Sequence, residues 1–391
     1  MKAGWQASSL GDLCNVIGGG TPAKDKAEFY SGDIPWATVR DMRSELITET
    51  EFRVTTAAVK NSSTNIIPGG NVVIATRVGL GKVCLLGQDT AINQDLRGIV
   101  PINPKVLGIR FLFWWLKSIA DLIVAEGTGA TVQGVKLPFV KGLQLPLPPL
   151  PEQQRIVTLL DEAFDGIAIA KANTEKNLLN ARAIFESHLQ SVFTQRGSAW
   201  LERSLGEAFK TVTGTTPPKN NFDFYGDFMP LAKPPELCGV PFNNAPDGLS
   251  EAGAKVARTL PAKSILVSCI GNLGKVGLNT VPVAFNQQIN AILPDERLAI
   301  PKFMFFQALS PIFKNQLESL ASGTTVPIVN KSKFNSVRIV LPPLLVQKTS
   351  VGQLESLSKE TNHLESIYQQ KLTALGELKK SLLHRAFTGQ L

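Results

Sequence analysis

Apolar side chains recur at three- and four-residue steps through one long stretch in the middle of the chain, from Leu145 to about Gln195. Prolines crowd the start of this stretch and are absent beyond Pro151, a residue that suits the first turn of a helix. We therefore predict a helix from Pro151 to Gln195, whose roughly 44 residues would span ~66 Å. Its apolar stripe consists of Phe164, Ile167, Thr174, Leu178, Ala181, Phe185 and Val192.

A second proline-led stretch, from Leu341 to Leu391, shows the same pattern at close to heptad spacing. Either stripe alone also fits a helix that packs against its own globular domain. Two matching long helices favour an intramolecular, antiparallel coiled coil, because a helix of this length needs a partner along it. The second stripe consists of Leu354, Leu357, Thr361, Leu364, Tyr368, Leu375, Leu378 and Leu382.

The remaining sequence alternates short β-branched runs with turns rich in Gly, Pro and Asn, which is typical of mixed α+β domains. VVIAT and SILVSCI are two of these runs. One apolar helix is predicted at Phe111–Val124 and another at Phe303–Leu320. The fold class expected is therefore α+β, with two similar domains separated by two long helices.

The order of motifs repeats about 195 residues later, which identifies one duplicated unit. Gly-Gly-Thr-Pro at 19–22 is matched by Gly-Thr-Thr-Pro at 214–217, and Ala-Ile-Asn-Gln at 91–94 by Ala-Phe-Asn-Gln at 284–287. Antiparallel helices would give such a molecule pseudo-twofold symmetry, and a duplex with two half-sites is the ligand that suits this shape. The predicted parts are a domain at 1–150, a helix at 151–198, a domain at 199–343 and a helix at 344–391.

Composition describes a globular protein of two to three domains: 391 residues, 43% hydrophobic and 18% charged. The net charge of +8 lies mainly in the two globular parts and is consistent with a polyanionic partner without requiring one. No signal peptide is visible, so we expect a cytoplasmic protein. The four cysteines lie far apart in sequence and no histidine has metal-ligand spacing, so we expect reduced thiols and no metal site.

Two motifs that resemble catalytic elements lack the residues that their chemistry needs. Gly79-Leu80-Gly81-Lys82 and its counterpart at 271–275 lack the first glycine and the Ser/Thr of a phosphate-binding loop, so tight turns are the better interpretation. Lys233-Pro234-Pro235-Glu236 lacks the flanking groups that hold a flipped base. We therefore predict a chain with no catalytic residues and no cofactor.

Five marks in their order resemble the specificity subunit of a type I DNA restriction-modification system. They are GGTP near the start of each domain (GTTP in the second), GDIPW, AINQ, LPPLPEQQRIV and the terminal LHRAFTGQL. The resemblance implies two target-recognition domains that each read half of a split DNA site, and two helices that act as a ruler. It also implies two modification subunits docked on the helices, with restriction subunits joining them, in a complex that would be an adenine methyltransferase and ATP-dependent endonuclease.

The expected docking site is the head of the first long helix, and it comprises Pro149, Glu152, Gln153, Arg155 and Ile156. The corresponding LPPLLVQK in the second half lacks the acid and the arginine, so docking there is expected to be weaker.

DNA contacts are expected from polar and basic residues in the turns of each domain, since such donors contact phosphates and base edges. Two alternatives remain: a self-sufficient DNA-modifying enzyme, testable by incubating the chain with DNA and S-adenosylmethionine, and a coiled-coil scaffold, testable by DNA protection. The residues predicted to contact DNA are Thr21, Lys24, Arg40, Arg77, Lys82, Lys136, Thr216, Lys219, Lys233, Lys275 and Lys331.

Overall fold

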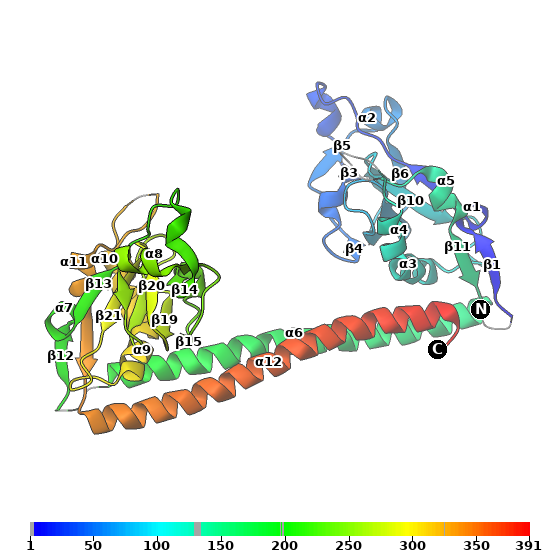
Figure 1. Cartoon of the computed structure of the whole chain (residues 1–391). Coiled ribbons are helices and arrows are strands. Elements are labelled where there is room, and N and C mark those ends of the chain that lie inside the picture. Colours follow the sequence, from blue (N-terminus) through cyan, green and yellow to red (C-terminus); the bar gives the residue numbers. More distant parts are fainter. Residues whose placement is uncertain (1–3, 129–133, 196, 198, 324) are drawn as a thin grey trace. The chain divides into compact units, whose positions relative to one another are not determined.

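The chain forms two compact units, each made of a globular part and segments of both long helices (Figure 1). A computed structural model describes residues 4–128, 134–195, 197, 199–323 and 325–391. The first unit comprises Met1–Thr174 and Gln370–Leu391, and the second comprises Glu175–Gln369. Within the described residues, no helix has both the length and the apolar character needed to cross a lipid bilayer.

The globular part of the first unit contains three sheets. A two-stranded sheet pairs β1 with β11, a five-stranded sheet has the order β2-β10-β7-β8-β4, and a four-stranded sheet has the order β5-β3-β9-β6. The pairs β3–β9 and β4–β8 are parallel, and the other named pairs of this part are antiparallel. The strands are β1 (Gln6–Ser9), β2 (Cys14–Gly18), β3 (Ile34–Ala37), β4 (Leu46–Ile47), β5 (Phe52–Val54), β6 (Asn65–Ile67), β7 (Val72–Ala75), β8 (Val83–Leu86), β9 (Thr90–Ile92), β10 (Leu96–Pro101) and β11 (Gln144–Leu147).

The second unit repeats this topology strand for strand. Its sheets have the orders β12-β22, β13-β21-β18-β19-β15 and β16-β14-β20-β17, and β14–β20 and β15–β19 are the parallel pairs among those named. The duplication seen in the sequence is therefore a duplication of fold. The strands are β12 (Leu201–Ser204), β13 (Lys210–Thr213), β14 (Tyr225–Ala232), β15 (Pro241–Phe242), β16 (Gly248–Leu249), β17 (Thr259–Leu260), β18 (Ile265–Ser268), β19 (Val276–Asn279), β20 (Val283–Phe285), β21 (Ile289–Leu293) and β22 (Arg338–Leu341).

Short helices connect the strands, and the mixed α+β class predicted from sequence is confirmed. In the first unit they are α1 (Leu10–Leu13), α2 (Thr56–Lys60), α3 (Ile109–Ser118), α4 (Ala120–Ala125), α5 (Leu137–Gly142) and the 3-10 turns η1 (Ala27–Tyr30) and η2 (Val39–Asp41). In the second they are α7 (Leu205–Ala208), α8 (Glu251–Val256), α9 (Pro301–Leu309), α10 (Pro311–Leu320), α11 (Lys331–Asn335), η3 (Phe222–Phe224) and η4 (Pro234–Glu236).

Each apolar helix that the sequence predicted as continuous is divided in two. In the second unit α9 ends before Ser310, whose extended backbone and hydroxyl cap α10, and Pro311 cannot supply the N–H that a continuous helix needs. In the first unit the break falls at Ile119, after Ser118 turns its hydroxyl back to the carbonyl of Trp115 at 2.6 Å.

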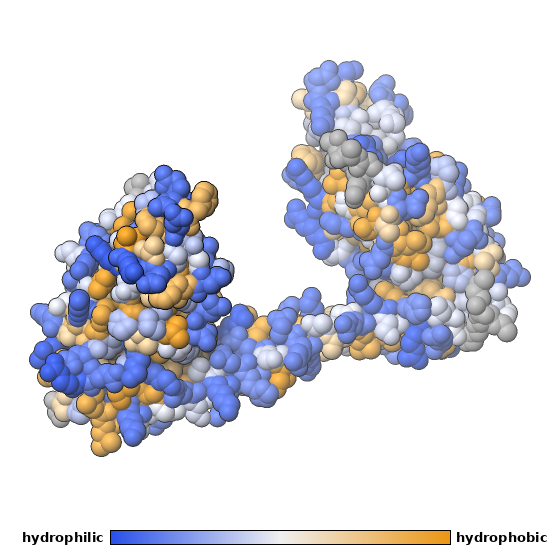
Figure 2. All heavy atoms as spheres, viewed as in Figure 1, coloured by the Kyte–Doolittle hydropathy of each residue, from blue (hydrophilic) through white to orange (hydrophobic). Residues whose placement is uncertain are grey.

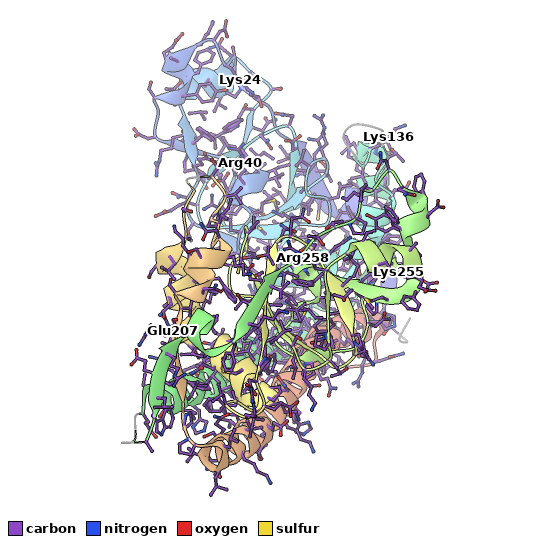
Figure 3. All side chains as sticks on the ribbon, turned by 60° about the vertical axis from the view of Figure 1, so that its left-hand side comes forward. Lys24, Arg40, Lys136, Glu207, Lys255 and Arg258 are labelled. Carbon is purple, nitrogen blue, oxygen red and sulfur yellow. The ribbon has the colours of Figure 1, made fainter. Side chains whose placement is uncertain are left out.

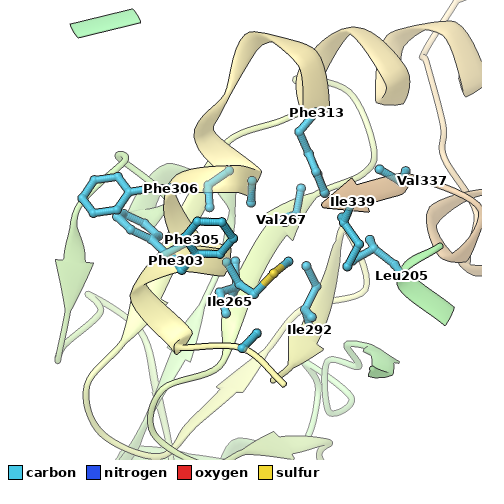
Figure 4. Packing of buried hydrophobic residues seen from close by; sticks show 14 of the residues in the cluster. Leu205, Ile265, Val267, Ile292, Phe303, Phe305, Phe306, Phe313, Val337 and Ile339 are labelled. Carbon is cyan, nitrogen blue, oxygen red and sulfur yellow. The ribbon is translucent and has the colours of Figure 1, made fainter. Parts of the chain in front are cut away.

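The aromatic face of α9 forms the centre of the second unit's core (Figure 4). Phe303, Phe305 and Phe306 are buried in one cluster with Ile265 of β18 and Ile292 of β21. In the first unit α3 supplies Phe111, Phe113 and Trp114 to an equivalent cluster. Burial of these large aromatic side chains stabilises each unit.

The two long helices are α6 (Leu150–Thr194) and α12 (Leu344–Thr388), and they pair antiparallel within each unit. In the first unit Leu383 and Phe387, near the end of α12, share a core with Ile156, near the start of α6. In the second, Phe193 near the end of α6 shares a core with Val351 near the start of α12. Each core therefore contains the beginning of one long helix and the end of the other.

The stripe predicted for α6 is buried or half-buried throughout, whereas the stripe predicted for α12 is wrong at two positions. Leu364 and Leu378 are 37% and 46% exposed. The next residues lie at the seam instead: Glu365 is held by Arg182 at 2.8 Å, and the Lys379 ammonium lies 4.7 Å from the ring centre of Phe164. Long charged side chains can cover a seam with their aliphatic stems, which a hydrophobic pattern does not reveal.

A buried glutamine fastens the head of each long helix to its globular part. Gln153 accepts from the N–H of Gly108 at 2.9 Å and donates to the carbonyls of Val106 at 2.8 Å and Pro148 at 2.9 Å. Gln347 makes the same three bonds in the second unit, with Ile300, Leu298 and Pro342. Both side chains are fully buried. Each amide therefore supplies hydrogen bonds to one backbone N–H and two backbone carbonyls, in place of the water that these groups would bind in the unfolded chain.

We predict that Gln153→Leu, or Gln347→Leu, lowers the free energy of unfolding by about 2–4 kcal/mol, because each leaves buried N–H and C=O groups without partners. Denaturant unfolding of the full chain measures the change. The matched control is Gln154→Leu at the neighbouring exposed position, where a change within about 0.5 kcal/mol is expected. Equal stability of Gln153→Leu and Gln154→Leu would contradict the role given to the buried amide.

Candidate nucleic-acid interface

A hollow of about 560 Å³ on the first unit brings three of the predicted DNA-binding residues together. Thr21, Lys24 and Arg40 lie on its lining, although they come from separate loops. Figure 3 shows Lys24 and Arg40 on the N-terminal segments of this unit. The lining mixes cationic, amide and aromatic groups, which is the composition that contacts phosphates and bases. The other lining residues are Tyr30, Trp36, Thr38, Val39, Phe52, Val78, Asn93, Gln94 and Asp95.

The Gly-Gly-Thr-Pro turn places Thr21 at this hollow because backbone groups approach it closely from both sides. A Cβ on Gly19 would overlap the carbonyl oxygens of Ile92 and Asn93, and one on Gly20 would overlap Ser63 and the backbone of Thr64. Glycine is therefore required at both positions.

Side-chain donors fix the rest of the turn. Trp36 donates its indole N–H to Gly20 at 3.1 Å, and Tyr30 donates its hydroxyl to the carbonyl of Pro22 at 2.8 Å. Thr21, between these anchors, donates its hydroxyl to the Oε1 of Gln94. The turn is thus held at three consecutive residues.

The second unit builds the same turn with one change. Gly214 again lies against the carbonyl oxygens of Phe285 and Asn286, and Tyr225 again donates to Pro217 at 2.8 Å. Thr215 stands where the first unit has Gly20, and its hydroxyl accepts from the backbone N–H of Arg258 at 2.9 Å. The substitution from GGTP to GTTP therefore follows from a different neighbour.

Thr216 is held in the same way as Thr21, because its hydroxyl donates to the Oε1 of Gln287 at 2.7 Å. Gln94 and Gln287 were missing from the predicted site residues. The signal that identifies them was present as the repeated Ala-x-Asn-Gln segment, which marked the duplication and the family resemblance but was not assigned to the site.

Besides Thr21 and Lys24, the predicted residues of the first unit lie on exposed turns, and Arg40 is among them. Arg40 and Arg77 form ion pairs with Glu51 and Asp95 at 3.7 and 3.6 Å. Both arginines are about half exposed or more, so these pairs are screened by water and leave the guanidinium groups accessible. Lys82 is exposed on the turn between β7 and β8, and Lys136 is exposed at the start of α5.

In the second unit the predicted lysines are less alike. Lys219 and Lys331 are exposed, and Lys275 is half-buried after the turn from β18. Lys233 is half-buried and bonded to the carboxylate of Asp247, so its charge is neutralised locally. Its backbone N–H also donates to Glu236 at 2.7 Å, so the Lys-Pro-Pro-Glu segment is a capped 3-10 turn.

The glycine-lysine segments are turns between strands, in agreement with the sequence analysis. Gly79 and Gly81 have φ values of 72° and 82°, and Gly271 and Gly274 both have 75°. These left-handed conformations favour glycine and close the β7–β8 and β18–β19 connections.

Two further arginines lie close to the duplicated turn. Arg97 is half-buried, and burial followed by the charge of Arg77 lowers its pKa. Arg258, beyond the end of α8, donates to the carbonyl of Thr213 at 2.7 Å (Figure 3). Neither was predicted, because neither lies in a recognisable turn motif.

The buried thiols offer no reactive group to this surface. Cys14, Cys84 and Cys269 are buried, and burial raises their pKa values to about 12, 11 and 12, while Cys238 is exposed. Among the described residues, no group of three or more His, Cys, Asp and Glu side chains is arranged to hold a metal ion.

Two of the five residues predicted for docking at the head of α6 are buried within the first unit. Gln153 and Ile156 are 1% exposed, Gln153 as the clamp described above and Ile156 within the core. Both side chains contact the globular part of their own unit. Pro149 is exposed, and Arg155 bonds to Glu152 at 2.7 Å and to the carbonyl of Leu391 at 2.9 Å.

Comparisons with known proteins agree with this duplicated architecture. The chain is 24% identical to the type I restriction enzyme MjaIX specificity subunit of Methanocaldococcus jannaschii, over 99% of this chain and 93% of that protein. It is 33% identical to the HindI specificity subunit of Haemophilus influenzae, over 49% of this chain and 42% of that protein.

Solved structures show the same fold. A chain from a study of complex assembly and conformational transition of the type I R-M system matches with a TM-score of 0.84 at 19% identity, over 100% of this chain and 99% of that one. The HsdS subunit from Thermoanaerobacter tengcongensis matches with a TM-score of 0.63 at 18% identity, over 100% and 98%. The family of type I restriction modification DNA specificity domains matches residues 2–180 and 197–374, once in each half. The chain therefore belongs to this family of DNA specificity proteins.

Proposed function

We propose that the chain is a non-catalytic recognition subunit in which residues 1–150 and 199–343 each read one half of a bipartite DNA site. The observation that carries the proposal is the duplicated turn: both units present a held threonine, a held glutamine and a nearby lysine on an exposed surface. Two such surfaces on one chain suit a ligand that offers two half-sites. The net charge of +8 favours a polyanion.

The surface of the first half-site reader is the hollow and the turns beside it. Lys24, Arg40 and Arg77 supply positive charge, and the remaining candidates Lys82 and Lys136 extend it on exposed turns. In the second reader Lys219, Lys275 and Lys331 serve in the same way, whereas Lys233 is left out because Asp247 neutralises it. Aromatic groups in the hollow, such as Phe52, supply apolar contact for base edges.

We predict that exchanging residues 199–343 for the matching part of a relative changes one half-site and leaves the other intact, because the sheets of each globular part are formed within that part. The measurement is sequencing of methylated sites in cells that carry the chain with its modification partner. The reciprocal exchange of residues 1–150 is the control and should change the other half-site. A change in both halves after either exchange would refute independent reading.

We further propose that two modification subunits dock on the long helices, with restriction subunits joining them. The head of α6 exposes Pro149 and the Glu152–Arg155 pair, and the head of α12 exposes Leu345 instead of an ion pair. The two heads differ in chemistry, which supports unequal docking strength. Hydrophobic residues also lie among the hydrophilic surface of the helices (Figure 2), including Leu159, Ile169, Leu179 and Ile184.

We predict that Arg155→Glu combined with Leu159→Asp abolishes co-purification with a modification subunit while the free energy of unfolding changes by less than about 1 kcal/mol, since both side chains are exposed. Lys60→Glu, on the exposed end of α2, is the matched charge reversal and should keep the partner. Retained assembly in the double variant would remove the head of α6 from the docking surface.

The helices are also proposed to set the distance between half-sites. Arg155 contacts Leu391 within the first unit, and Arg182 contacts Glu365 within the second, so the two long helices run antiparallel in each unit. The chain passes from one unit to the other at Thr174–Glu175 in α6 and at Gln369–Gln370 in α12. A lengthening at these two positions preserves the seam on both sides, provided it adds close to whole turns.

We predict that four helix-forming residues inserted after Lys176 and four after Gln369 lengthen the spacer by about one or two base pairs, because four residues add ~6 Å and ~40° beyond a full turn. Two-residue insertions at both places rotate the distal part by ~200° and should abolish recognition. Methylated-site sequencing reports both results. An unchanged spacer in the four-residue variant would show that the helices do not set the distance.

A further inference from the structure

The fold itself does not need the hydrogen bonds that hold the side chains of Gln94 and Gln287. Gln94 and Gln287 are exposed, so their hydrogen bonds to Thr21 and Thr216 satisfy no buried group. A long exposed side chain normally keeps its rotamer freedom, and holding it in one orientation is unfavourable for stability. The same unfavourable arrangement occurs in both units, which points to a ligand that gains from an oriented carboxamide.

The loop that carries each glutamine is rigid. Asn93 and Asn286, one residue earlier, are buried, and their Oδ1 atoms each accept from a backbone N–H two residues on at 3.1 Å. Gly19 and Gly214 hold the facing turn against the carbonyls of these same asparagines. The threonine and the glutamine therefore have fixed backbones on both sides, and the carboxamide is placed before any ligand arrives.

The orientation of the amide determines what it can bind. Because Oε1 of Gln287 accepts from Thr216 at 2.7 Å, and Oε1 of Gln94 from Thr21, the free group in each unit is the Nε2 amide with its hydrogens. This exposed Nε2 amide can donate a hydrogen bond to an acceptor oxygen or nitrogen of a ligand. Lys24 and Lys219, three residues after each threonine, are exposed cations at matching positions.

The residues around this shared group differ between the units. Arg40 of η2 in the first unit corresponds to Pro235 of η4 in the second, and Asp95 after Gln94 corresponds to Gln288. Residues that read different half-sites must differ, whereas a group kept the same in both serves a feature that all duplex shares. The shared feature of DNA is its sugar-phosphate backbone.

We propose that Gln94 and Gln287 each donate Nε2–H to a phosphate oxygen of their half-site, with Thr21 and Thr216 as positioning residues. The proposal rests on the proposed function, in which each globular part binds DNA. These contacts fix the register of each reader on the duplex and carry no sequence information. The neighbours that differ, Arg40 and Asp95 in the first unit and Gln288 in the second, are then left to read bases.

The test uses the full chain assembled with its modification subunits, a library of duplexes, and several salt concentrations. Gln94→Ala and Gln287→Ala are each expected to lower affinity about tenfold for every duplex, with an unchanged consensus and an unchanged salt slope, because a neutral donor displaces no counterion. Lys24→Ala is expected to reduce the salt slope by about one. Thr21→Ser should retain affinity and Thr21→Val should lose part of it.

Gln88→Ala is the control, since Gln88 is an exposed glutamine of the same unit bonded to the carbonyl of Thr48 at 2.8 Å. It should bind as the unaltered chain does. An altered base preference in one half-site for Gln94→Ala, or no loss of affinity, would overturn the phosphate contact while the bipartite site of the unaltered chain still upheld the proposed function. If the unaltered chain showed no bipartite site, the proposed function would fall and the inference with it.

Discussion

The antiparallel pairing of α6 with α12 is the constraint on which both units depend. Each core takes in the start of one long helix and the end of the other, so Leu383 and Phe387 complete the first unit, and Leu189 and Phe193 complete the second. Neither globular part owns all of its hydrophobic core. Separation of the two long helices would therefore expose apolar surface in both units. The burial of this surface stabilises the pairing even though charged residues lie between the helices.

Sequence reasoning recovered the large features because they are periodic. The helix predicted from Pro151 begins at Leu150, and the repeat of Gly-x-Thr-Pro and Ala-x-Asn-Gln corresponds to two units with identical strand order. The repeat also located the candidate surface, since Thr21, Lys24 and Arg40 line one hollow. The DNA contacts assigned to individual residues are still predictions.

The details that sequence reasoning missed depend on tertiary contacts. Leu364 and Leu378 looked like seam residues, but the seam takes Glu365 and Lys379 because Arg182, Phe164 and Glu45 provide partners for them. Gln153 looked like a surface docking residue, and only the backbone of residues 106–108 shows that it is buried. Hydrophobic periodicity predicts which face of a helix is buried. It does not predict which polar residues lie on that face, because their partners are distant in sequence.

The hydrogen bonds of Gln153 and Gln347 and the charged side chains of the candidate surface should respond differently to ionic strength. They fasten helix to globular part with uncharged hydrogen bonds in a dry environment, where dissolved salt screens nothing. The lysines and arginines of the candidate surface face water, so their attraction to a polyanion weakens steeply as ionic strength rises. Rising ionic strength is therefore expected to weaken the attraction to a polyanion while it leaves the hydrogen bonds of Gln153 and Gln347 unchanged.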